Sequence, residues 1–384
     1  MALESTPTPQ RMHALDALRA GLMLLGILLH VACSFQLGEG DSGWPYCDPE
    51  QSLGATLSVI AIHVVRMPLF FVVAGLTAAL LVRRRGTRDF ILSRLRRVAL
   101  PLFVGWLLLT PLVGFAFAHA LAVAKGASPD GSITYHRPLP GDPAHLWFLY
   151  YLLLVTLAML ILRGLIALAP GIRAAVKRLA DAIFVGRWRR FRVPTIALAL
   201  TPLLLSMEQP TLDTPKGWTI EPRILAFYFA CFALGWAIER CDGLLPSLRQ
   251  GAWLRTVGGV LGIAATTLLA LVCYGLASEG KHSESRTAFV VAQVAGAWTL
   301  ALLSLGLLGV CERAFSRERP FVRSLVDASY WIYLIHLPLS VYAAVSLRGW
   351  EASAAAKIAV ATLLVTALCI ASYQAALAVL PRRA

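Results

Sequence analysis

Residues 53–82 read LGATLSVIAIHVVRMPLFFVVAGLTAALLV, and residues 83–97 after them read RRRGTRDFILSRLRR. The first stretch exceeds the about 20 mostly apolar residues that a membrane-spanning helix needs, and the second is typical of a basic cytoplasmic segment. This alternation recurs along the chain, in which 58% of the 384 residues are hydrophobic. It predicts an all-α polytopic membrane bundle that crosses the bilayer about ten times, at residues 17–36, 53–82, 98–124, 145–169, 193–207, 222–240, 254–277, 287–311, 328–347 and 354–380.

The Lys and Arg residues give this bundle a direction. With the N-terminus inside, 25 of the 35 fall in inner segments and 8 in outer ones, as the positive-inside rule requires. We therefore expect a cytoplasmic tail at 1–14, one transmembrane domain at 15–381 and a cytoplasmic tail at 382–384. The formal net charge of +14 then reflects topology, and we expect no nucleic-acid partner because no basic helix or aromatic platform accompanies it. The outer segments 38–52 and 126–144 either line an entrance for a polar substrate or are ordinary turns.

Ionisable residues inside a span are costly and therefore indicate function. The first span carries Asp16, Arg19 and His30. Arg19 and His30 are eleven residues apart, which places them on one helix face, about 16 Å apart along the axis. Arg19 would lie near the cytoplasmic end and His30 beyond the middle. The alternative is an interfacial arginine paired with Asp16 and a histidine satisfied inside the bundle.

The second span carries His63 and Arg66, which are three residues apart and share a face. His63 would lie about 15 Å from the outer edge, near the depth of His30. An arginine in the middle of a bilayer does not face lipid. The alternative for Arg66 is a structural role, in which it donates hydrogen bonds to backbone carbonyls that Pro68 leaves free.

Three further places carry candidate residues. Arg94 and Arg97 lie three apart on a predicted amphipathic helix and suit bidentate contacts with phosphate; their alternative is topology-setting charge against anionic lipid. His145 and Trp147 open the fourth span, and His336 lies in SYWIYLIHLPL at 329–339. These residues could face an interior cavity, although aromatic residues at a span end also form interfacial belts. The 7 cysteines have no metal-site spacing, so we expect no metal and no resident cofactor.

The ionisable residues named above lie at successive depths and form a polar column through the membrane. Such a column could serve transport or a reaction between the two sides of the membrane. Transmembrane proton relays usually rely on buried carboxylates, whereas the deep residues here are His and Arg. Histidine can act as a general base near neutral pH, and arginine can bind phosphate or stabilise an oxyanion. The residues favour acyl transfer from a phosphate-bearing carrier to a hydroxyl. A transporter of a glycan, a lipid-linked or a small anionic substrate is the alternative.

The stretch LDALRAGLMLLGILLH at 15–30 resembles the opening span of the membrane-bound acyltransferase-3 family, with an Arg and a His separated by ten residues. Arg94-Leu-Arg-Arg97 resembles the family's pair of arginines. RMPLFFVVAGL at 66–76, HLWFLYYLLL at 145–154 and SYWIYLIHLPL at 329–339 also look like family segments, in family order. The likeness is closest to the branch of the osmoregulated periplasmic glucan succinyltransferase.

The resemblance implies that His30 is the general base on the acceptor hydroxyl, that Arg19 holds or polarises the acyl donor, and that Arg94 and Arg97 contact acyl-CoA phosphates. The expected function is an O-acyltransferase of the bacterial inner membrane. It would move an acetyl or succinyl group from the co-substrate acyl-CoA to an extracytoplasmic carbohydrate such as a glucan, in contact with membrane lipid and possible envelope-biosynthesis partner proteins. Depth and face alone suggest a supporting polar cluster of Asp16, His63, Arg66 and His336, with His145 and Trp147 on the acceptor side.

Overall fold

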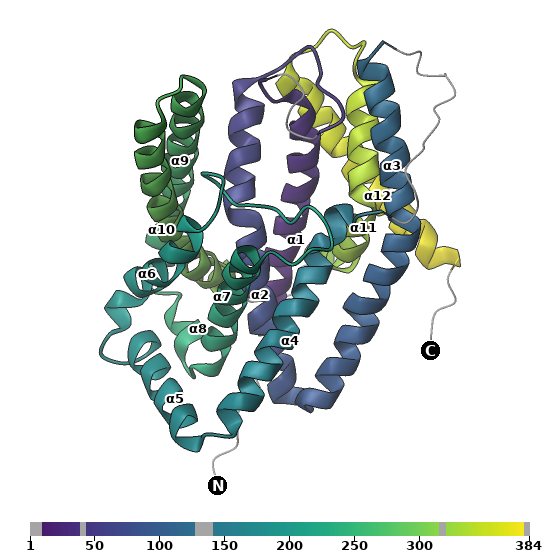
Figure 1. Cartoon of the computed structure of the whole chain (residues 1–384). Helices are drawn as coiled ribbons and strands as arrows, with labels where there is room; N and C mark the ends of the chain where they lie inside the picture. The colour runs from purple at the N-terminus through teal and green to yellow at the C-terminus, as the bar shows by residue number, and fades with distance from the viewer. Residues whose placement is uncertain (1–9, 39–43, 127–140, 315–319, 380–384) are drawn as a thin grey trace.

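The computed structural model describes residues 10–38, 44–126, 141–314 and 320–379, without the side chains of 10–12 and 320–321. The described residues form helices and connecting segments and contain no β-strand. Figure 1 shows most of the long helices running between the two ends of one bundle. The helices are α1 (Gln10–Ala32), α2 (Leu53–Arg94), α3 (Leu100–Ala124), α4 (Trp147–Ala167), α5 (Pro170–Phe184), α6 (Arg192–Leu205), α7 (Pro222–Arg240), α8 (Leu244–Ser247), α9 (Ala252–Ser278), α10 (His282–Ala314), α11 (Pro320–Ser346) and α12 (Ala354–Val379).

Helices lie at all ten predicted spans. By length and composition, 8 continuous stretches can cross a membrane, and one of them, Leu53–Ala124, holds both the second and the third predicted span. The all-α polytopic membrane bundle is thereby confirmed. The fifth predicted span forms only the 14-residue α6, which at 1.5 Å per residue is about 21 Å long and falls short of the about 30 Å hydrocarbon core. A helix at this place is confirmed, and a full crossing by it stays a prediction.

The basic segment between the second and third predicted spans is a corner in a nearly continuous helix. α2 passes through Gly86 with φ of 80° and ψ of 171°, a conformation that glycine adopts without a steric penalty. A π-helical turn at Leu95–Ala99 then joins α2 to α3. Figure 1 shows the chain turning at the lower end and rising again through α3. The predicted amphipathic helix therefore begins at this corner and continues into the third span.

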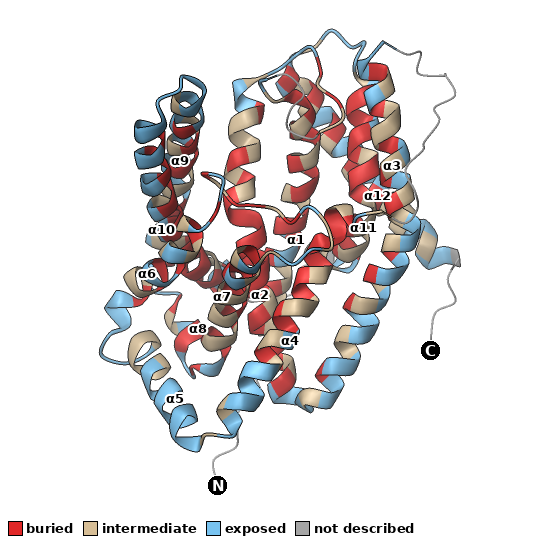
Figure 2. Cartoon of the chain, in the orientation of Figure 1, coloured by how far each residue is buried: buried red, intermediate tan, exposed pale blue. Residues whose placement is uncertain are grey.

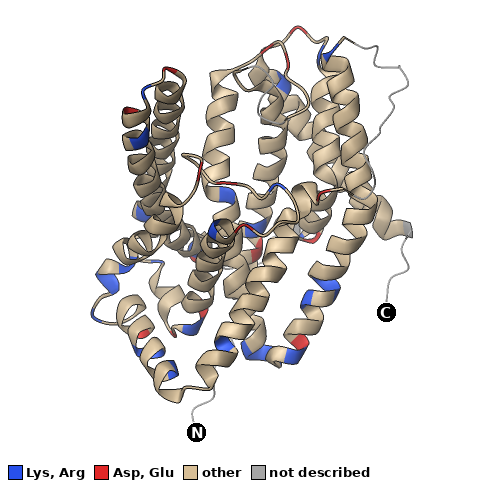
Figure 3. Ribbon diagram, in the orientation of Figure 1, with Lys and Arg blue, Asp and Glu red and all other residues tan. Residues whose placement is uncertain are grey.

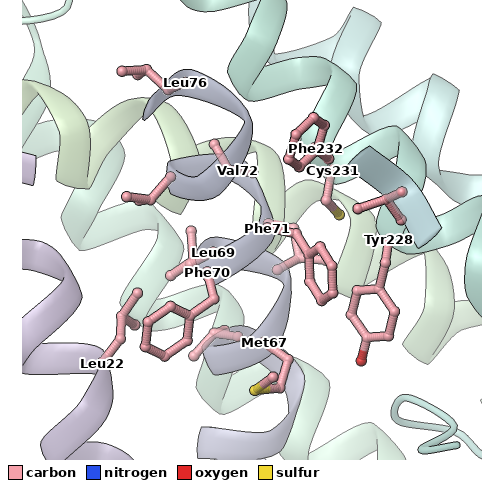
Figure 4. Close-up of a cluster of buried hydrophobic side chains, with 14 of the residues drawn as sticks. Leu22, Met67, Leu69, Phe70, Phe71, Val72, Leu76, Tyr228, Cys231 and Phe232 are labelled. Atoms are coloured by element: carbon pink, nitrogen blue, oxygen red, sulfur yellow. The ribbon is translucent and has the colours of Figure 1, made fainter. Parts of the chain in front are cut away.

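Glycines allow the backbones of α2 and α7 to touch. A Cβ at Gly75 would lie 2.8 Å from the carbonyl carbon of Phe232, and one at Gly235 would lie 2.7 Å from that of Val72. Small residues at such crossings are typical of membrane helices, whose association depends on close packing. The ring of Phe71 stacks on Tyr228 at 4.4 Å between centroids, and Figure 4 shows this aromatic contact beside the crossing. The crossing fixes the part of α2 that carries Arg66.

Burial follows the pattern of a membrane bundle. Figure 2 shows buried residues along the inner sides of the central helices, with exposed residues on α5 and on the outer side of α9. Outward leucines such as Leu254 (79% exposed) and Leu363 (70% exposed) suit contact with lipid tails. α5 lies between the predicted spans 145–169 and 193–207, where the sequence predicts no helix. Its apolar and basic residues are both exposed, as in helices that lie along a membrane interface.

Charge separates the two ends of the bundle. Figure 3 shows that most Lys and Arg residues gather at the end where α1 begins and where α2 turns into α3. We refer to this end as inner, following the predicted topology. α1 begins at Gln10, within the predicted tail 1–14. The remainder of that tail, the tail 382–384 and residues 127–140 of the outer segment lie outside the described residues.

Candidate active site

One face of α1 runs from Arg19 at the inner end to His30 near the outer end. Leu22, Gly26 and His30 follow one another at four-residue spacing, which aligns them in a row along a helix. Arg19 retains 44% side-chain exposure, and its Nη1 lies 3.6 Å from Oδ1 of Asp16. The charges of Arg19 and Arg94 also act on each other. A basic group therefore gathers at the inner end of this face, and His30 lies at its other end.

His30 belongs to a cluster of three histidines. Its ring centroid lies 5.1 Å from that of His336 on α11, and the ring of His336 lies 5.7 Å from that of His145, at the start of α4. His336 and His145 are buried, with 2% and 8% exposure, and His30 is half-buried. Residues more than 300 positions apart in the sequence thus meet in one imidazole cluster.

Backbone carbonyls determine the tautomers of two of these rings. Nδ1 of His336 donates to the carbonyl oxygens of Ile332 and Tyr333 at 3.0 and 2.8 Å. Nε2 of His145 donates to the carbonyl of Leu334 at 2.9 Å. In a neutral imidazole the other nitrogen is then an acceptor. Nε2 of His336, Nδ1 of His145 and Nδ1 of His30 are all buried without a hydrogen-bond partner among the described residues. Nε2 of His336 and Nδ1 of His145 are therefore acceptor nitrogens that need a donor, such as a hydroxyl group, and Nδ1 of His30 lies beside them without a partner among the same residues.

The backbone around His145 is held against α11, which positions its ring beside that of His336. His145 lies in a short 3-10 turn, Ala144–Leu146, whose first residue has the unusual φ of 47°. The hydroxyl of Tyr333 donates to the carbonyl of His145 at 2.8 Å. Both the ring and the backbone of His145 are thus fastened to α11. Positive φ at a residue other than glycine is strained and is often found at functional sites.

The segment after α1 brings Trp44 over His30. The two rings stack with centroids 5.7 Å apart and planes 10° from parallel. Nε1 of Trp44 donates to Oγ of Ser34 at 2.8 Å, and the ring of Trp44 makes an edge contact with Phe117 of α3, with 5.5 Å between the ring centroids. Within the outer segment 38–52, for which an entrance and ordinary turns were the two interpretations, the described residue Trp44 therefore covers the ring of His30.

A buried ion pair fixes this covering segment to α12. Nζ of Lys357 lies 2.9 Å from Oδ1 of Asp48, and the two side chains are 2% and 0% exposed. The hydroxyl of Tyr46 donates to the other carboxylate oxygen at 3.0 Å; burial and the carboxylate together raise the pKa of Tyr46, which keeps this donor protonated. Lys357 is one of the 8 Lys and Arg residues that the sequence assigns to the outer side, at the start of the last predicted span. The structure encloses it at the start of α12, where Asp48 supplies its counter-charge.

Arg66 on α2 is a buried cation whose charge reaches the histidine cluster. It is 5% exposed, and its charge acts on His30, His63, His145 and His336. Its Nε donates to the carbonyl of Leu22 on α1 at 3.0 Å. Arg66 thus donates to a backbone carbonyl, as the structural alternative expects, but this carbonyl belongs to α1 and is not one that Pro68 leaves free.

His63 lies outside the ring cluster. Its Nε2 donates to the carbonyl of Leu212 at 3.0 Å and lies 3.1 Å from Oγ1 of Thr214. His63 therefore fastens the segment between α6 and α7 to α2. Trp147 is also separate, because its ring packs against Tyr151 and Tyr228 at 6.0 and 5.6 Å, within an aromatic group of α4 and α7.

The two arginines of the basic segment have different surroundings. The guanidinium of Arg94 lies 5.1 Å from the ring centroid of Phe90, and its Nε is buried. Arg97 is exposed. The π-helical turn between them has i→i+5 hydrogen bonds, so their three-residue spacing does not give the common face of an α-helix. Of the two, Arg94 is the one near Arg19.

Several residues of this region were not predicted from the sequence. Trp44, Asp48, Lys357, Gly26 and Tyr333 come from four separate segments. A composition rich in Trp, Tyr and Asp in the outer segment was the available signal for two of them. Among the described residues no group of three or more His, Cys, Asp or Glu side chains is arranged to hold a metal ion.

Comparisons with known proteins agree with these features. A family model described as an acyltransferase domain matches residues 12–374. Proteins named glucans biosynthesis protein C from Salmonella gallinarum (strain 287/91), Salmonella typhi and Salmonella typhimurium (strain LT2) are each 25% identical over 343 residues, which cover 88% of this chain and 85% of the relative. No solved structure matches the chain. The chain therefore belongs to the acyltransferase-3 family of multi-pass membrane enzymes.

Proposed function

We propose that this acyltransferase moves an acyl group from cytoplasmic acyl-CoA to a hydroxyl of an extracytoplasmic glucan, in the bacterial inner membrane. The observation that carries the proposal is the cluster of buried imidazoles around His30, whose acceptor nitrogens lack a hydrogen-bond donor among the described residues. An acceptor hydroxyl would supply that donor. The glucan is suggested by the name of the relatives, glucans biosynthesis protein C.

His30 would act as the general base. It takes the proton from the acceptor hydroxyl while the oxygen attacks the carbonyl carbon of the thioester. The tetrahedral intermediate then breaks its carbon–sulfur bond, and the CoA thiolate leaves with the proton that His30 received. The product is an ester, and His30 returns to its neutral form.

The inner end of the same α1 face would hold the donor. Arg19 and Arg94 form a positive region there, and arginine suits the phosphates of a CoA carrier. From Arg19 to His30 the helix rises about 16 Å. A carrier with phosphates at one end and the thioester at the other could span that distance. His336 and His145 would orient the hydroxyl beside His30.

Turnover by the purified protein tests this proposal. The full chain in nanodiscs is given succinyl-CoA or acetyl-CoA with a soluble oligoglucan, and released thiol is measured together with the mass of the glucan. We expect ester formation that is lost in His30→Ala. His119→Ala is the matched control, because His119 lies on α3 and its ring contacts Tyr342, and among the described residues it makes no ring contact or hydrogen bond with His30, His145 or His336. Retained transfer by correctly inserted His30→Ala would overturn the assignment of the base.

A further inference from the structure

Arg66 has few protein partners for a buried guanidinium. It donates one hydrogen bond, from Nε to the carbonyl of Leu22, and its Cζ lies 5.9 Å from the ring centroid of Phe70. Among the described residues, no carboxylate pairs with it and no acceptor takes a hydrogen bond from its Nη1 or Nη2. An unpaired charge inside an apolar bundle is costly. Such a cation is expected where a negative charge arrives or develops.

Gly26 provides the space that Arg66 occupies. A Cβ at position 26 would lie 2.5 Å from Cζ of Arg66 and closer still to Nη2. Any other residue there would displace the guanidinium. Gly26 is four residues before His30, so the two share a face about 6 Å apart along α1. The guanidinium therefore lies against the same face as His30, one turn closer to the inner end.

The neighbouring side chains cannot supply this positive charge. The tautomers of His336 and His145 place acceptor nitrogens toward the cluster, as their carbonyl bonds require. Acceptor nitrogens repel a developing oxyanion, whereas guanidinium N–H groups stabilise it. Arg66 is thus the buried cation of the described residues that lies between the basic inner end and His30 on this face.

We propose that Arg66 is a catalytic residue that stabilises the oxyanion of the tetrahedral intermediate, and that Gly26 is its positioning residue. This inference rests on the proposed function, in which a hydroxyl attacks a thioester. When the new carbon–oxygen bond forms, the carbonyl π electrons move to the carbonyl oxygen, and Nη1 and Nη2 donate to that oxygen. When the carbon–sulfur bond breaks, the electrons return to the carbonyl. Arg66 neither gains nor loses a proton.

The test displaces the guanidinium without deleting it. In Gly26→Ala we expect kcat to fall about 10²–10³-fold, the size of effect seen when one oxyanion donor is lost, with KM for acyl-CoA little changed. Arg66→Gln should show a similar loss. Gly21→Ala is the matched control on the same helix, because nothing lies within 4 Å of a Cβ at that position, and it should keep wild-type turnover. Gly26→Ala or Arg66→Gln with wild-type kcat would overturn the inference.

A double-mutant cycle separates positioning from a general packing defect. If Gly26 acts through Arg66, Gly26→Ala should cause no further loss in the Arg66→Gln background. If the losses in kcat of the two single variants instead multiply in the double variant, that coupling is contradicted. Arg66→Lys, which lacks Nη2, provides a second background if Arg66→Gln does not insert, and the effect of Gly26→Ala should shrink there. An undiminished effect would contradict the inference.

His30→Ala in the same assay distinguishes the two proposals. Full turnover in that variant would overturn the proposed base chemistry itself. Loss of turnover in His30→Ala together with normal kcat in Gly26→Ala and Arg66→Gln would overturn only the role of Arg66.

Discussion

Lys357 and Arg66 are both buried cations among long apolar helices, but of the two only Lys357 has a carboxylate partner among the described residues. Lys357 meets Asp48 at 2.9 Å in a pair that is almost fully enclosed. Asp48 in turn accepts from Tyr46 and from the backbone N–H of Glu50. In the part of the chain that the structure describes, Arg66 has a single backbone carbonyl as its hydrogen-bond acceptor, and its charge acts on four histidines.

The difference shows how to separate a charge that holds the fold from one that serves chemistry. A buried charge that is paired and hydrogen-bonded can fix a segment in one arrangement, although the pair itself need not add stability. An unpaired buried charge contributes nothing of that kind. It persists when function requires it, because proteins commonly retain local destabilisation at active sites. We therefore expect removal of Lys357 to lower stability more than turnover, and removal of Arg66 to lower turnover more than stability.

The largest effect on stability is expected from Lys357→Met. This change leaves the carboxylate of Asp48 buried without its counter-charge, and breaking a buried pair in this way costs about 3–5 kcal/mol. Thermal or denaturant unfolding of the protein in detergent micelles measures it. In the double variant Asp48→Asn/Lys357→Met no charge stays behind, so most of the lost stability should return. A double variant as unstable as the single one would show that the pair matters for a reason other than charge.

A smaller effect is expected from Trp44→Ala, since Trp44 connects the anchored segment to His30. The variant loses an aromatic stack, which contributes about 0.5–1.5 kcal/mol, and a hydrogen bond to Ser34, which contributes a similar amount. Unfolding of the variant provides the measurement. Trp44→Phe keeps a ring over His30 and should lose only the hydrogen bond. If both variants unfold like the wild type, the segment does not depend on this contact.

Arg66→Met should leave the unfolding free energy unchanged or raise it. No carboxylate among the described residues loses its partner, and a methionine of similar length fills the space with apolar contacts. Unfolding of the variant beside Lys357→Met gives the comparison directly. A loss approaching that of Lys357→Met would mean that Arg66 has a structural role. Arg66→Met should also lack turnover, so that it loses activity without losing stability, whereas Lys357→Met loses stability.

The fold was largely predictable because the apolar runs and the distribution of arginines follow from bilayer physics. The row from Arg19 to His30 was predictable as well, since helical periodicity determines it. The meeting of His30 with His336 and His145 was not, because it depends on how α1, α4 and α11 pack. Gly26 carries no signal of its own in the sequence, where it is one glycine among apolar residues. Lys357 was counted with the outer charges, and its buried pair was not predictable because Asp48 lies 309 residues away.

A third charged group joins Arg223, at the start of α7, to Glu208, in the segment after α6, and it is exposed where the first two cations are buried. Nη1 of Arg223 lies 2.6 Å from Oε1 of Glu208, whose side chain is 66% exposed. The hydrogen bond and charge of Arg223 lower the pKa of Glu208. A lowered pKa in the folded state gives stability that is present above the unfolded value of about 4.3 and is lost as the pH falls through the folded value. Exposed pairs contribute little and are screened by salt.

We therefore expect only a slight decrease in the unfolding midpoint attributable to Glu208 as the pH falls below about 4.3. Unfolding between about pH 3 and pH 7, with low and high salt, measures it. Glu208→Gln should flatten this part of the pH dependence, and salt should reduce it in the wild type. The enclosed pair of Lys357 and Asp48 should respond far less to salt, because buried charges are screened much less than exposed ones. An identical pH profile in Glu208→Gln would mean that Arg223 does not depend on Glu208 and is held by Asp213 and Glu221, which lie 3.3 and 3.0 Å from its guanidinium.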